Sequence, residues 1–276
     1  MGLSIKVHNR LLDLSSPKVM AILNITPDSF YTSCGYESEV NILQQVQDFL
    51  TQGADIIDIG ACSTRPNSTP ISAEEEWKRL EPALTAIRTH FPNAILSIDT
   101  FRAEIAEKAV SLGADIINDV YGGMEDPAMW KTVAKLGAPY ILTYAQSLLE
   151  HDQKGDYDYT MSGLVDFFQK GLDQLHKLGV ADVILDPGFG FAKTEQQQYT
   201  ILSQLDVLSI LHAPVLVGVS RKSMLYRPLG LTPTDVFPAT IAANTLALER
   251  GANILRVHDV AAAKQTIQVF QLTHNS

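Results

Sequence analysis

The sequence predicts an α/β protein that folds as one (β/α)8 TIM barrel spanning residues 1–276. Three observations support this prediction. Eight short runs of β-type apolar residues recur along the chain, and a longer segment with helical periodicity follows each run. A six-residue motif occurs three times, each time with the pattern of a helix stop, a tight turn and a buried strand. No linker rich in Pro, Gly or Ser divides the chain, so the eight units form a single domain.

The eight apolar runs are the expected strands of a parallel barrel. Several are apolar at consecutive positions, as expected for strands that are covered on both faces. The runs are Val19–Ile25, Asp55–Ile59, Ile95–Asp99, Ile116–Asn118, Tyr140–Leu142, Val183–Asp186, Val215–Val219 and Ile254–Val257. An open, doubly wound sheet is the competing arrangement, but no G-x-G-x-x-G motif follows the first run.

Capping residues predict where the intervening helices begin and end. Ser72 and Glu75 have the spacing of a capping box, which begins a helix extending toward Thr89. Glycine is favoured just beyond the last helical residue. The other predicted helices are Phe101–Leu112 before Gly113, a helix begun by Asp126-Pro127 and ended by Gly137, a helix from Thr194 to about Leu211, and Pro238–Arg250 before Gly251.

The repeated motif places a polar residue at the far end of a strand in each copy. The copies are Gly53-Ala54-Asp55-Ile56-Ile57-Asp58, Gly113-Ala114-Asp115-Ile116-Ile117-Asn118 and Gly251-Ala252-Asn253-Ile254-Leu255-Arg256. Other polar residues at or just beyond strand ends are Asn24, Asp99, Asp119, Asp186, His258 and the segment Ser220-Arg221-Lys222-Ser223. In a TIM barrel these ends form the mouth where active sites lie.

The polar residues at the mouth indicate the chemistry of a ligand. Charged groups gathered there are costly unless a ligand satisfies them. Carboxylates and an amide, as in Asp99, Asn118 and Asp186, suit a heterocycle with several N–H donors. A basic set suits a ligand that bears a phosphate or a carboxylate, and it comprises Arg65, Lys222, Arg256 and His258.

Composition excludes several classes of protein. Hydrophobic residues make up 46% and charged residues 19%, which is ample for a buried core. A formal net charge of -10 argues against a broad basic surface for nucleic acid or anionic lipid. The two cysteines, Cys34 and Cys62, are too few for a disulfide framework. We find no signal-peptide pattern and no apolar run of about 18 residues, and therefore expect a soluble, cytoplasmic protein that binds neither nucleic acid nor membrane.

Seven segments together resemble one known family. They are Ile22-Leu23-Asn24-Ile25-Thr26-Pro27-Asp28-Ser29-Phe30, Ser63-Thr64-Arg65-Pro66, Ser97-Ile98-Asp99-Thr100, Ile117-Asn118-Asp119, Leu185-Asp186-Pro187-Gly188-Phe189-Gly190-Phe191-Ala192-Lys193-Thr194, Ser220-Arg221-Lys222-Ser223 and Arg256-Val257-His258-Asp259-Val260. Each segment alone is a weak signal, but their joint order on eight barrel units is specific. From about Val19 to Val269 the chain resembles dihydropteroate synthase, a pterin-binding TIM-barrel family.

The resemblance implies a transferase of folate biosynthesis that is usually a homodimer and requires Mg2+. Such an enzyme joins 6-hydroxymethyl-7,8-dihydropterin diphosphate to 4-aminobenzoate, releases pyrophosphate and 7,8-dihydropteroate, and is a sulfonamide target. The implied substrate-binding residues are Asp99, Asn118, Asp186 and Lys222 at the pterin; Asn24, Arg256 and His258 at the diphosphate; Thr64, Arg65, Pro66, Ser223 and Phe30 at the 4-aminobenzoate; and Phe191. The implied catalytic residues are Lys222, Arg256 and His258, and Asn24 is the implied metal ligand.

The chemistry agrees with this implied reaction. The aniline nitrogen is already nucleophilic, so no strong base is needed. Departure of pyrophosphate is the difficult step, and Arg256, His258 and Mg2+ would offset the negative charge that grows on it. We therefore expect a dissociative substitution in which electrostatics and positioning dominate.

The sequence also departs from the family pattern and leaves two other functions open. Tyr31-Thr32-Ser33-Cys34-Gly35 replaces a common Asp-Gly-Gly stretch, Asn67 replaces a frequent glycine, and Thr143-Tyr144 replaces a frequent Met-His pair. One alternative is a corrinoid-linked pterin methyltransferase, which has no substrate diphosphate to hold. The other is a non-catalytic pterin-binding barrel.

Overall fold

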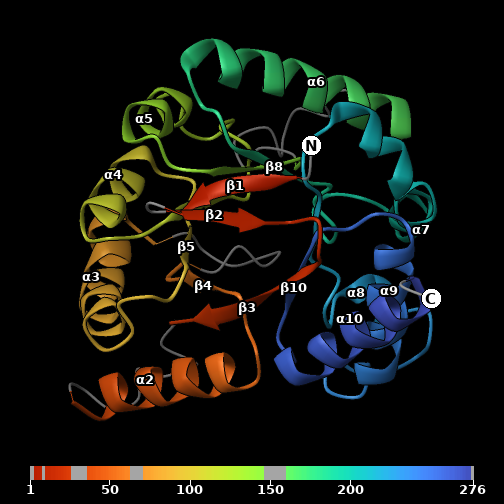
Figure 1. Ribbon diagram of the computed structural model, residues 1–276, viewed down its shortest axis with the longest axis horizontal. Helices are drawn as coiled ribbons and strands as arrows, with labels where there is room; N and C mark the ends of the chain where they lie inside the picture. The colour runs from red at the N-terminus through yellow and green to blue at the C-terminus, as the bar shows by residue number, and fades with distance from the viewer. Residues whose placement is uncertain (1–2, 8–9, 26–35, 63–70, 146–159, 275–276) are drawn as a thin grey trace.

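Eight parallel strands form the centre of the molecule, and helices surround them (Figure 1). The computed structural model describes residues 3–7, 10–25, 36–62, 71–145 and 160–274. The eight strands are β3 (Lys18–Asn24), β4 (Ile56–Gly60), β5 (Leu96–Asp99), β6 (Ile116–Asp119), β7 (Tyr140–Thr143), β8 (Val183–Asp186), β9 (Leu216–Val217) and β10 (Ile254–Val257). Each predicted run coincides with one of these strands, so the predicted single-domain barrel is confirmed.

The sheet closes on itself between its two end strands. Its order is β8-β7-β6-β5-β4-β3-β10-β9, and a parallel bridge between Leu185 and Val215 links β8 to the segment that enters β9. A hydrogen bond of 2.8 Å from the Leu185 amide to the Pro214 carbonyl supports this closure. β9 is shorter than the predicted run Val215–Val219, and the Asn253 side chain accepts from the Val215 amide just before it.

Helices follow the strands and cover the outside of the barrel (Figure 1). The helices are α2 (Tyr36–Thr51), α3 (Ala73–His90), α4 (Ala103–Ser111), α5 (Met129–Leu136), α6 (Met161–Leu178), α7 (Glu195–Ser203), the 3-10 helix η2 (Leu205–Leu211), α8 (Ser223–Tyr226), α9 (Phe237–Glu249) and α10 (Val260–His274). Ser72 begins α3 as predicted, since its hydroxyl accepts from the Glu75 amide at 3.1 Å. Within the described ranges, no helix is long and apolar enough to cross a membrane.

Two predicted helices differ from the structure at their ends. The helix expected to begin at Asp126 begins at Met129, because the Asp126 carboxylate accepts from the amides of Ala103 and Ala128 instead. The helix expected to run from Thr194 to Leu211 is interrupted at Gln204. Thr194 does cap α7 in a full capping box, and the chain continues beyond Gln204 as the tighter helix η2.

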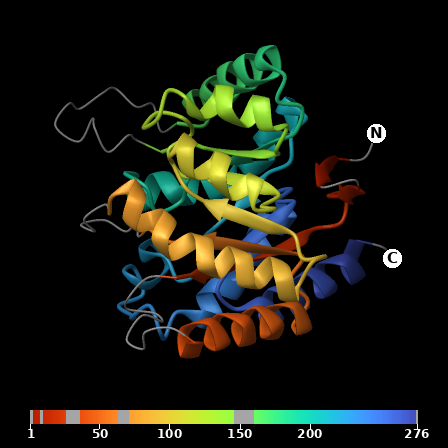
Figure 2. The same cartoon turned by 90° about the vertical axis from the view of Figure 1, so that its left-hand side faces the viewer.

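An N-terminal hairpin covers the end of the barrel where the strands begin. Its strands, β1 (Ser4–Val7) and β2 (Arg10–Asp13), pair antiparallel and lie across the ring in Figure 1, and Figure 2 shows the hairpin to one side of the sheet. Ile5, Val7 and Leu14 pack on a layer of inward-facing residues near the starts of the eight strands. That layer comprises Met20, Ile56, Ile95, Ile116, Ile141, Ile184, Leu216 and Ile254. The hairpin was not predicted.

The three copies of the sequence motif have the same role in the sheet. At the third position of each copy, the side chain accepts a backbone N–H from the strand beside it. Asp55 accepts from Val19 at 2.9 Å, Asp115 from Leu96 at 2.8 Å and Asn253 from Val215 at 2.9 Å. Each copy thereby fixes its own strand to the strand before it in the chain, at the point where the chain leaves a helix and enters the sheet.

Candidate active site

A polar layer fills the barrel interior above the apolar layer. Side chains two positions apart on a strand share a face, so the residue two beyond each apolar inward residue also points inward. The second layer, with one residue from each strand, is Ile22, Asp58, Ser97, Asn118, Thr143, Asp186, Gly218 and Arg256. Six of these eight residues are polar, which is unusual for a barrel core and indicates a site that opens toward the carboxyl ends of the strands.

Sheet register brings further predicted residues to this end. Asn24 pairs with Gly60, Gly60 with Asp99, and Asp99 with Asn118, in one row across four adjacent strands. A Cβ added at Gly60 would lie 3.5 Å from Asn24 Oδ1 and 3.7 Å from Asp99 Oδ2, so the side chains of Asn24 and Asp99 both lie against this glycine. Asp119 points outward instead, where it accepts from the Tyr140 hydroxyl at 2.7 Å and has a structural role.

Arg256 is the centre of a charged cluster. Its Nε donates to Asp58 Oδ2 at 2.7 Å, and its Nη2 donates to Asp99 Oδ2 at 2.8 Å. Asn118 Nδ2 donates to the same Asp58 oxygen at 3.0 Å. These contacts join β4, β5, β6 and β10. They also include the sixth residue of every copy of the sequence motif, so the repeat places Asp58, Asn118 and Arg256 in mutual contact through Asp58.

Several buried polar atoms in the layer lack a protein partner. Among the described residues, Asp58 Oδ1, Ser97 Oγ, Asn118 Oδ1 and Thr143 Oγ1 are buried and have no hydrogen-bond partner. Unsatisfied buried polar atoms are uncommon in native proteins and carry a cost of about 1–3 kcal/mol each. Four of them on four neighbouring strands indicate a cavity that a polar ligand or water completes.

Two lysines lie close to Asp186, Lys193 from the loop after β8 and Lys222 from the loop after β9. Asp186 Oδ1 accepts from the Gly188 amide at 2.8 Å. Lys193 Nζ donates to the Tyr144 carbonyl at 2.7 Å and to the Gly188 carbonyl at 3.0 Å, and Lys222 Nζ donates to the Phe189 carbonyl. The two ammonium groups therefore hold the loop against the ends of β7 and β8.

Burial shifts the pKa values of this charged group. It raises the pKa of Asp186, and it lowers the pKa of Lys222 to about 8 and that of Lys193 to about 7, with Asp186 opposing both decreases. Burial also raises the pKa of Asp99, against the opposing influence of Arg256. Perturbed values of this kind are concentrated at functional sites.

An aromatic cluster borders the polar layer. Phe191 lies edge-on to Tyr121, with ring centroids 6.4 Å apart, and Tyr121 lies edge-on to Phe101 at 5.4 Å. Lys222 Nζ lies 5.0 Å from the centroid of Phe191, in cation–π geometry. Cys62, buried in the same cluster, has a raised pKa because burial disfavours its thiolate. The cluster gives the site an apolar wall.

The remaining predicted residues lie at the same end or outside the described residues. His258 Nδ1 is 3.0 Å from the Ser220 hydroxyl, and Ser223 begins α8 directly after Lys222. Phe30, Thr64, Arg65 and Pro66 lie outside the described residues, as do Tyr31–Gly35 and Asn67. The structure thus brings Asp99, Asn118 and Arg256 together, with Asp186 and Lys222 in the same charged group.

The described residues do not form a metal site built from protein ligands alone. They contain no group of three or more His, Cys, Asp or Glu with metal-ligand geometry. Mg2+ is usually held by one or two protein oxygens together with substrate phosphates. The Asn24 amide oxygen at the end of β3 fits that mode, whereas Asp58 and Asp99 are already paired with Arg256.

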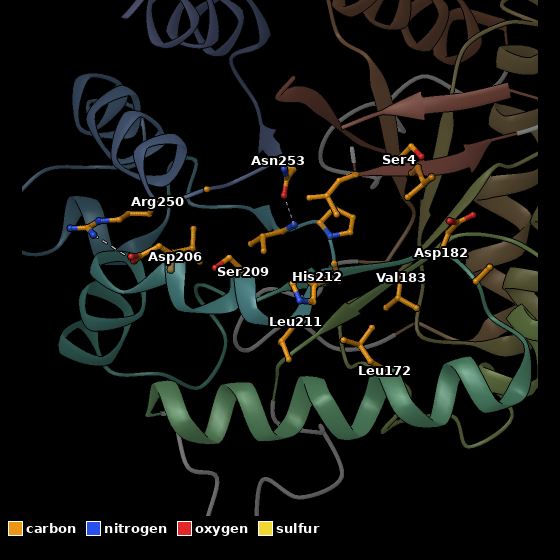
Figure 3. Close-up of a pocket in the computed structure, with 18 of the residues that line it drawn as sticks. Ser4, Leu172, Asp182, Val183, Asp206, Ser209, Leu211, His212, Arg250 and Asn253 are labelled. Carbon is orange, nitrogen blue, oxygen red and sulfur yellow. Dashed lines mark hydrogen bonds and ion pairs between the residues drawn. The ribbon is translucent and has the colours of Figure 1, made fainter. Parts of the chain in front are cut away.

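A separate cavity of about 710 Å3 lies at the opposite end of the barrel (Figure 3). Val183 and Asn253, near the starts of β8 and β10, line it together with Leu172 of α6 and Leu211 of η2. Of the residues predicted for the substrates, none of those that the structure describes lines this cavity. The cavity is therefore distinct from the polar layer.

Sequence reasoning missed four residues of the site. Asp58 was noted only as a strand-end residue in the repeat, although it contacts two predicted binding residues. Ser97 lies in one of the family-like segments and Thr143 in a departure from the family pattern, but a hydroxyl inside an apolar run is a weak signal of a site residue. Lys193 lies in a family-like segment for which the resemblance implies no role at that position. Strand alternation would have found Ser97 and Thr143, since each lies two residues beyond an inward-facing isoleucine.

Comparisons with known proteins agree with this geometry. Residues 20–258 match the family described as pterin binding enzymes. The dihydropteroate synthase of Haemophilus influenzae is 37% identical over 98% of both chains, and that of Escherichia coli K12 is 34% identical over 95% of this chain and 93% of its own.

Solved structures give the same result. The Xanthomonas albilineans dihydropteroate synthase with 4-aminobenzoic acid has a TM-score of 0.91 and 32% identity over 100% of both chains. The Yersinia pestis dihydropteroate synthase in a sulfonamide complex has a TM-score of 0.90 and 34% identity over 99% of this chain and 100% of its own. The fold, the site and these matches define a TIM-barrel enzyme, and the chain belongs to the pterin binding enzymes. Within them it is grouped with the dihydropteroate synthases, transferases of folate synthesis.

Proposed function

We propose that the chain joins 6-hydroxymethyl-7,8-dihydropterin diphosphate to 4-aminobenzoate, with the polar layer as the pterin site. The observation that supports this most is the set of buried acceptors there. Asp186 and the free Asn118 Oδ1 both face inward, and the amino-pyrimidinone edge of a pterin presents adjacent N–H donors. Hydrogen bonds to a charged carboxylate contribute about 1.5–3 kcal/mol each.

The cations of the site have the position needed for the diphosphate. Arg256 directs Nε and Nη2 to carboxylates, which leaves Nη1 for a phosphate oxygen. Lys222 lies beside Asp186 and Arg256, and His258 follows the end of β10. We infer that Lys222, Arg256 and His258 are the catalytic residues, because each would offset negative charge as the bond between methylene carbon and phosphate oxygen breaks.

The reaction then needs little further chemistry. The amine of 4-aminobenzoate attacks the pterin methylene, the new C–N bond forms, and a proton leaves the nitrogen. Phe191 gives one wall of the second substrate site, and Ser223 with Thr64, Arg65, Pro66 and Phe30 would complete it. A sulfonamide, which resembles 4-aminobenzoate in shape, is expected to compete there.

Charge balance supports a role for Mg2+. Asp58, Asp99 and Asp186 offset Arg256, Lys222 and Lys193, so the described cluster has no surplus positive charge for a diphosphate. A Mg2+ ion held at the site would supply that charge to the phosphate groups. Asn24 would contribute one protein oxygen.

A homodimer is the proposed assembly. Leu246 of α9 is 56% exposed, and Val269 and Leu272 of α10 are 62% and 77% exposed. Large apolar side chains grouped on adjacent helices favour a contact between copies. Light scattering of the purified protein tests this, with a molecular mass twice that of one chain as the expected result.

Pyrophosphate release tests the function directly. With the pterin diphosphate and Mg2+ present, adding 4-aminobenzoate should release one pyrophosphate for each 7,8-dihydropteroate formed, and omitting it should stop both. Tight pterin diphosphate binding without release would favour the non-catalytic barrel. Methyl transfer from methyltetrahydrofolate to a corrinoid would instead favour the methyltransferase.

A further inference from the structure

Asp58 has contacts that no role assigned above explains. It is completely buried in β4, and its Oδ1 has no hydrogen-bond partner among the described residues. Its Oδ2 accepts from both Asn118 and Arg256, at 3.0 and 2.7 Å. Asp58 therefore touches a residue proposed for the pterin and a residue proposed for the diphosphate, and it can influence both substrates through them.

The contact with Asn118 fixes the orientation of its amide. A carboxylate accepts hydrogen bonds but cannot donate them, so only the NH2 end of the amide is stable against Asp58. The amide oxygen must then point the other way, and Asn118 Oδ1 is one of the buried acceptors without a partner among the described residues. A flipped amide would present a donor to the donor edge of the pterin. The charge of Asp58 thus selects the orientation that can bind.

The contact with Arg256 fixes the plane of the guanidinium. Asp58 holds Nε while Asp99 holds Nη2, and two carboxylates on different nitrogens define the plane of a rigid group. Without Asp58, the side chain keeps one anchor and can rotate about it. Asp58 therefore also sets the direction in which Nη1 points.

We propose that Asp58 is a positioning residue that orients Asn118 toward the pterin and Arg256 toward the diphosphate. This inference rests on the proposed function. It predicts different binding losses for the two residues. Loss of Arg256 should weaken mainly the binding of the pterin diphosphate, whereas loss of the Asp58 charge should also weaken the binding of the dephosphorylated pterin.

Calorimetry of Asp58→Asn tests this pattern. We expect affinity for the dephosphorylated pterin to fall about tenfold, because only the contact with Asn118 is lost. Affinity for the pterin diphosphate should fall about a hundredfold, because the contact with Arg256 is lost as well. The KM for 4-aminobenzoate should stay within about twofold, whereas a general distortion of the barrel would raise it. Unchanged pterin affinity in Asp58→Asn would overturn the inference.

Asp115→Asn is the matched control. Asp115 is also a buried aspartate paired with an arginine, Arg88, at 2.9 Å, but it lies at the start of β6. It should lose stability without losing pterin affinity. An equal loss of pterin affinity in both variants would show that Asp58 acts only through stability and would overturn the inference.

A double variant tests the inference if Asp58→Asn does not fold. Replacing Arg256 together with Asp58 removes their buried pair and leaves only Asp99 without its cation, which is less costly than leaving both carboxylates unpaired. Asp58→Asn/Arg256→Met should then bind dephosphorylated pterin about tenfold more weakly than Arg256→Met, and equal affinities would overturn the inference. If the unaltered protein binds no pterin at all, the proposed function fails instead.

Discussion

Replacing Arg256 by methionine should destabilise the free protein strongly. The methionine keeps most of the volume but leaves Asp58 and Asp99, with side chains 0% and 9% exposed, without their cation. At 2.7 and 2.8 Å, and with an effective dielectric of about 20, each attraction is about 6 kcal/mol before desolvation is subtracted. Breaking a buried pair typically costs about 3–5 kcal/mol, and we expect a loss of that size at pH 8.

The loss should shrink in acid. Burial raises the pKa of Asp99, and Arg256 is the main opposing influence, so the variant has a still higher folded-state pKa. Between the unfolded value of about 3.9 and that raised value, the folded variant binds more protons than the unfolded chain. Stability of the variant therefore falls as pH rises through this window. The unaltered protein shares this fall only up to its own Asp99 pKa of about 7, so the deficit grows above that pH and is smaller at pH 5 than at pH 8.

Urea unfolding followed by circular dichroism at pH 5 and pH 8 measures both effects. Arg221→Met is the control, because its pair with Asp259 is partly exposed, at 35% and 23%, and should contribute no more than about 1 kcal/mol. A deficit for Arg256→Met below about 1 kcal/mol at pH 8, or one that is equal at both pH values, would refute this reasoning.

Three further predictions concern the loop after β8. Asp186→Ala should abolish detectable pterin binding in calorimetry, and unchanged affinity would remove Asp186 from the site. Gly188→Ala should lower kcat/KM at least about tenfold in the pyrophosphate assay, because φ is +70° and the added carbon would lie 2.2 Å from the Tyr144 carbonyl oxygen. The lowered pKa of Lys193, about 7 against 10.5, means that the unfolded chain binds more protons between these values, so stability should rise with pH there. Lys193→Met should flatten that rise in urea titrations, and an unchanged slope would contradict the assignment.

The strands could be predicted from sequence because each is a run of consecutive apolar residues between helix signals. The N-terminal hairpin could not, since each of its strands has four residues and only Ile5 and Val7 of β1 are buried. Those two side chains are buried only because they pack on the starts of the barrel strands, which the local sequence does not show. Likewise, Asp126 has the residue type of a helix cap, but its carboxylate accepts hydrogen bonds from the amides of Ala103 and Ala128, and the helix begins only at Met129.

The sequence predicts those residues of the candidate site that lie at the ends of strands. Asp99, Asn118, Asp186 and Arg256 were found in this way, and the structure places them on the inward face. The role of Asp58 could not be predicted, because the repeat shows three equivalent positions without showing that they meet. That contact depends on barrel closure, which brings β4 and β10 to either side of β3.

The structure of the complex with 6-hydroxymethyl-7,8-dihydropterin diphosphate and Mg2+ tests the central claim most directly. We predict that the ring lies in the polar layer with its N–H edge on Asp186 and Asn118 Oδ1, and that the diphosphate contacts Arg256 Nη1 and His258. A ligand bound in the cavity at the opposite end of the barrel, or a ring whose N–H edge faces away from Asp186, would contradict the account.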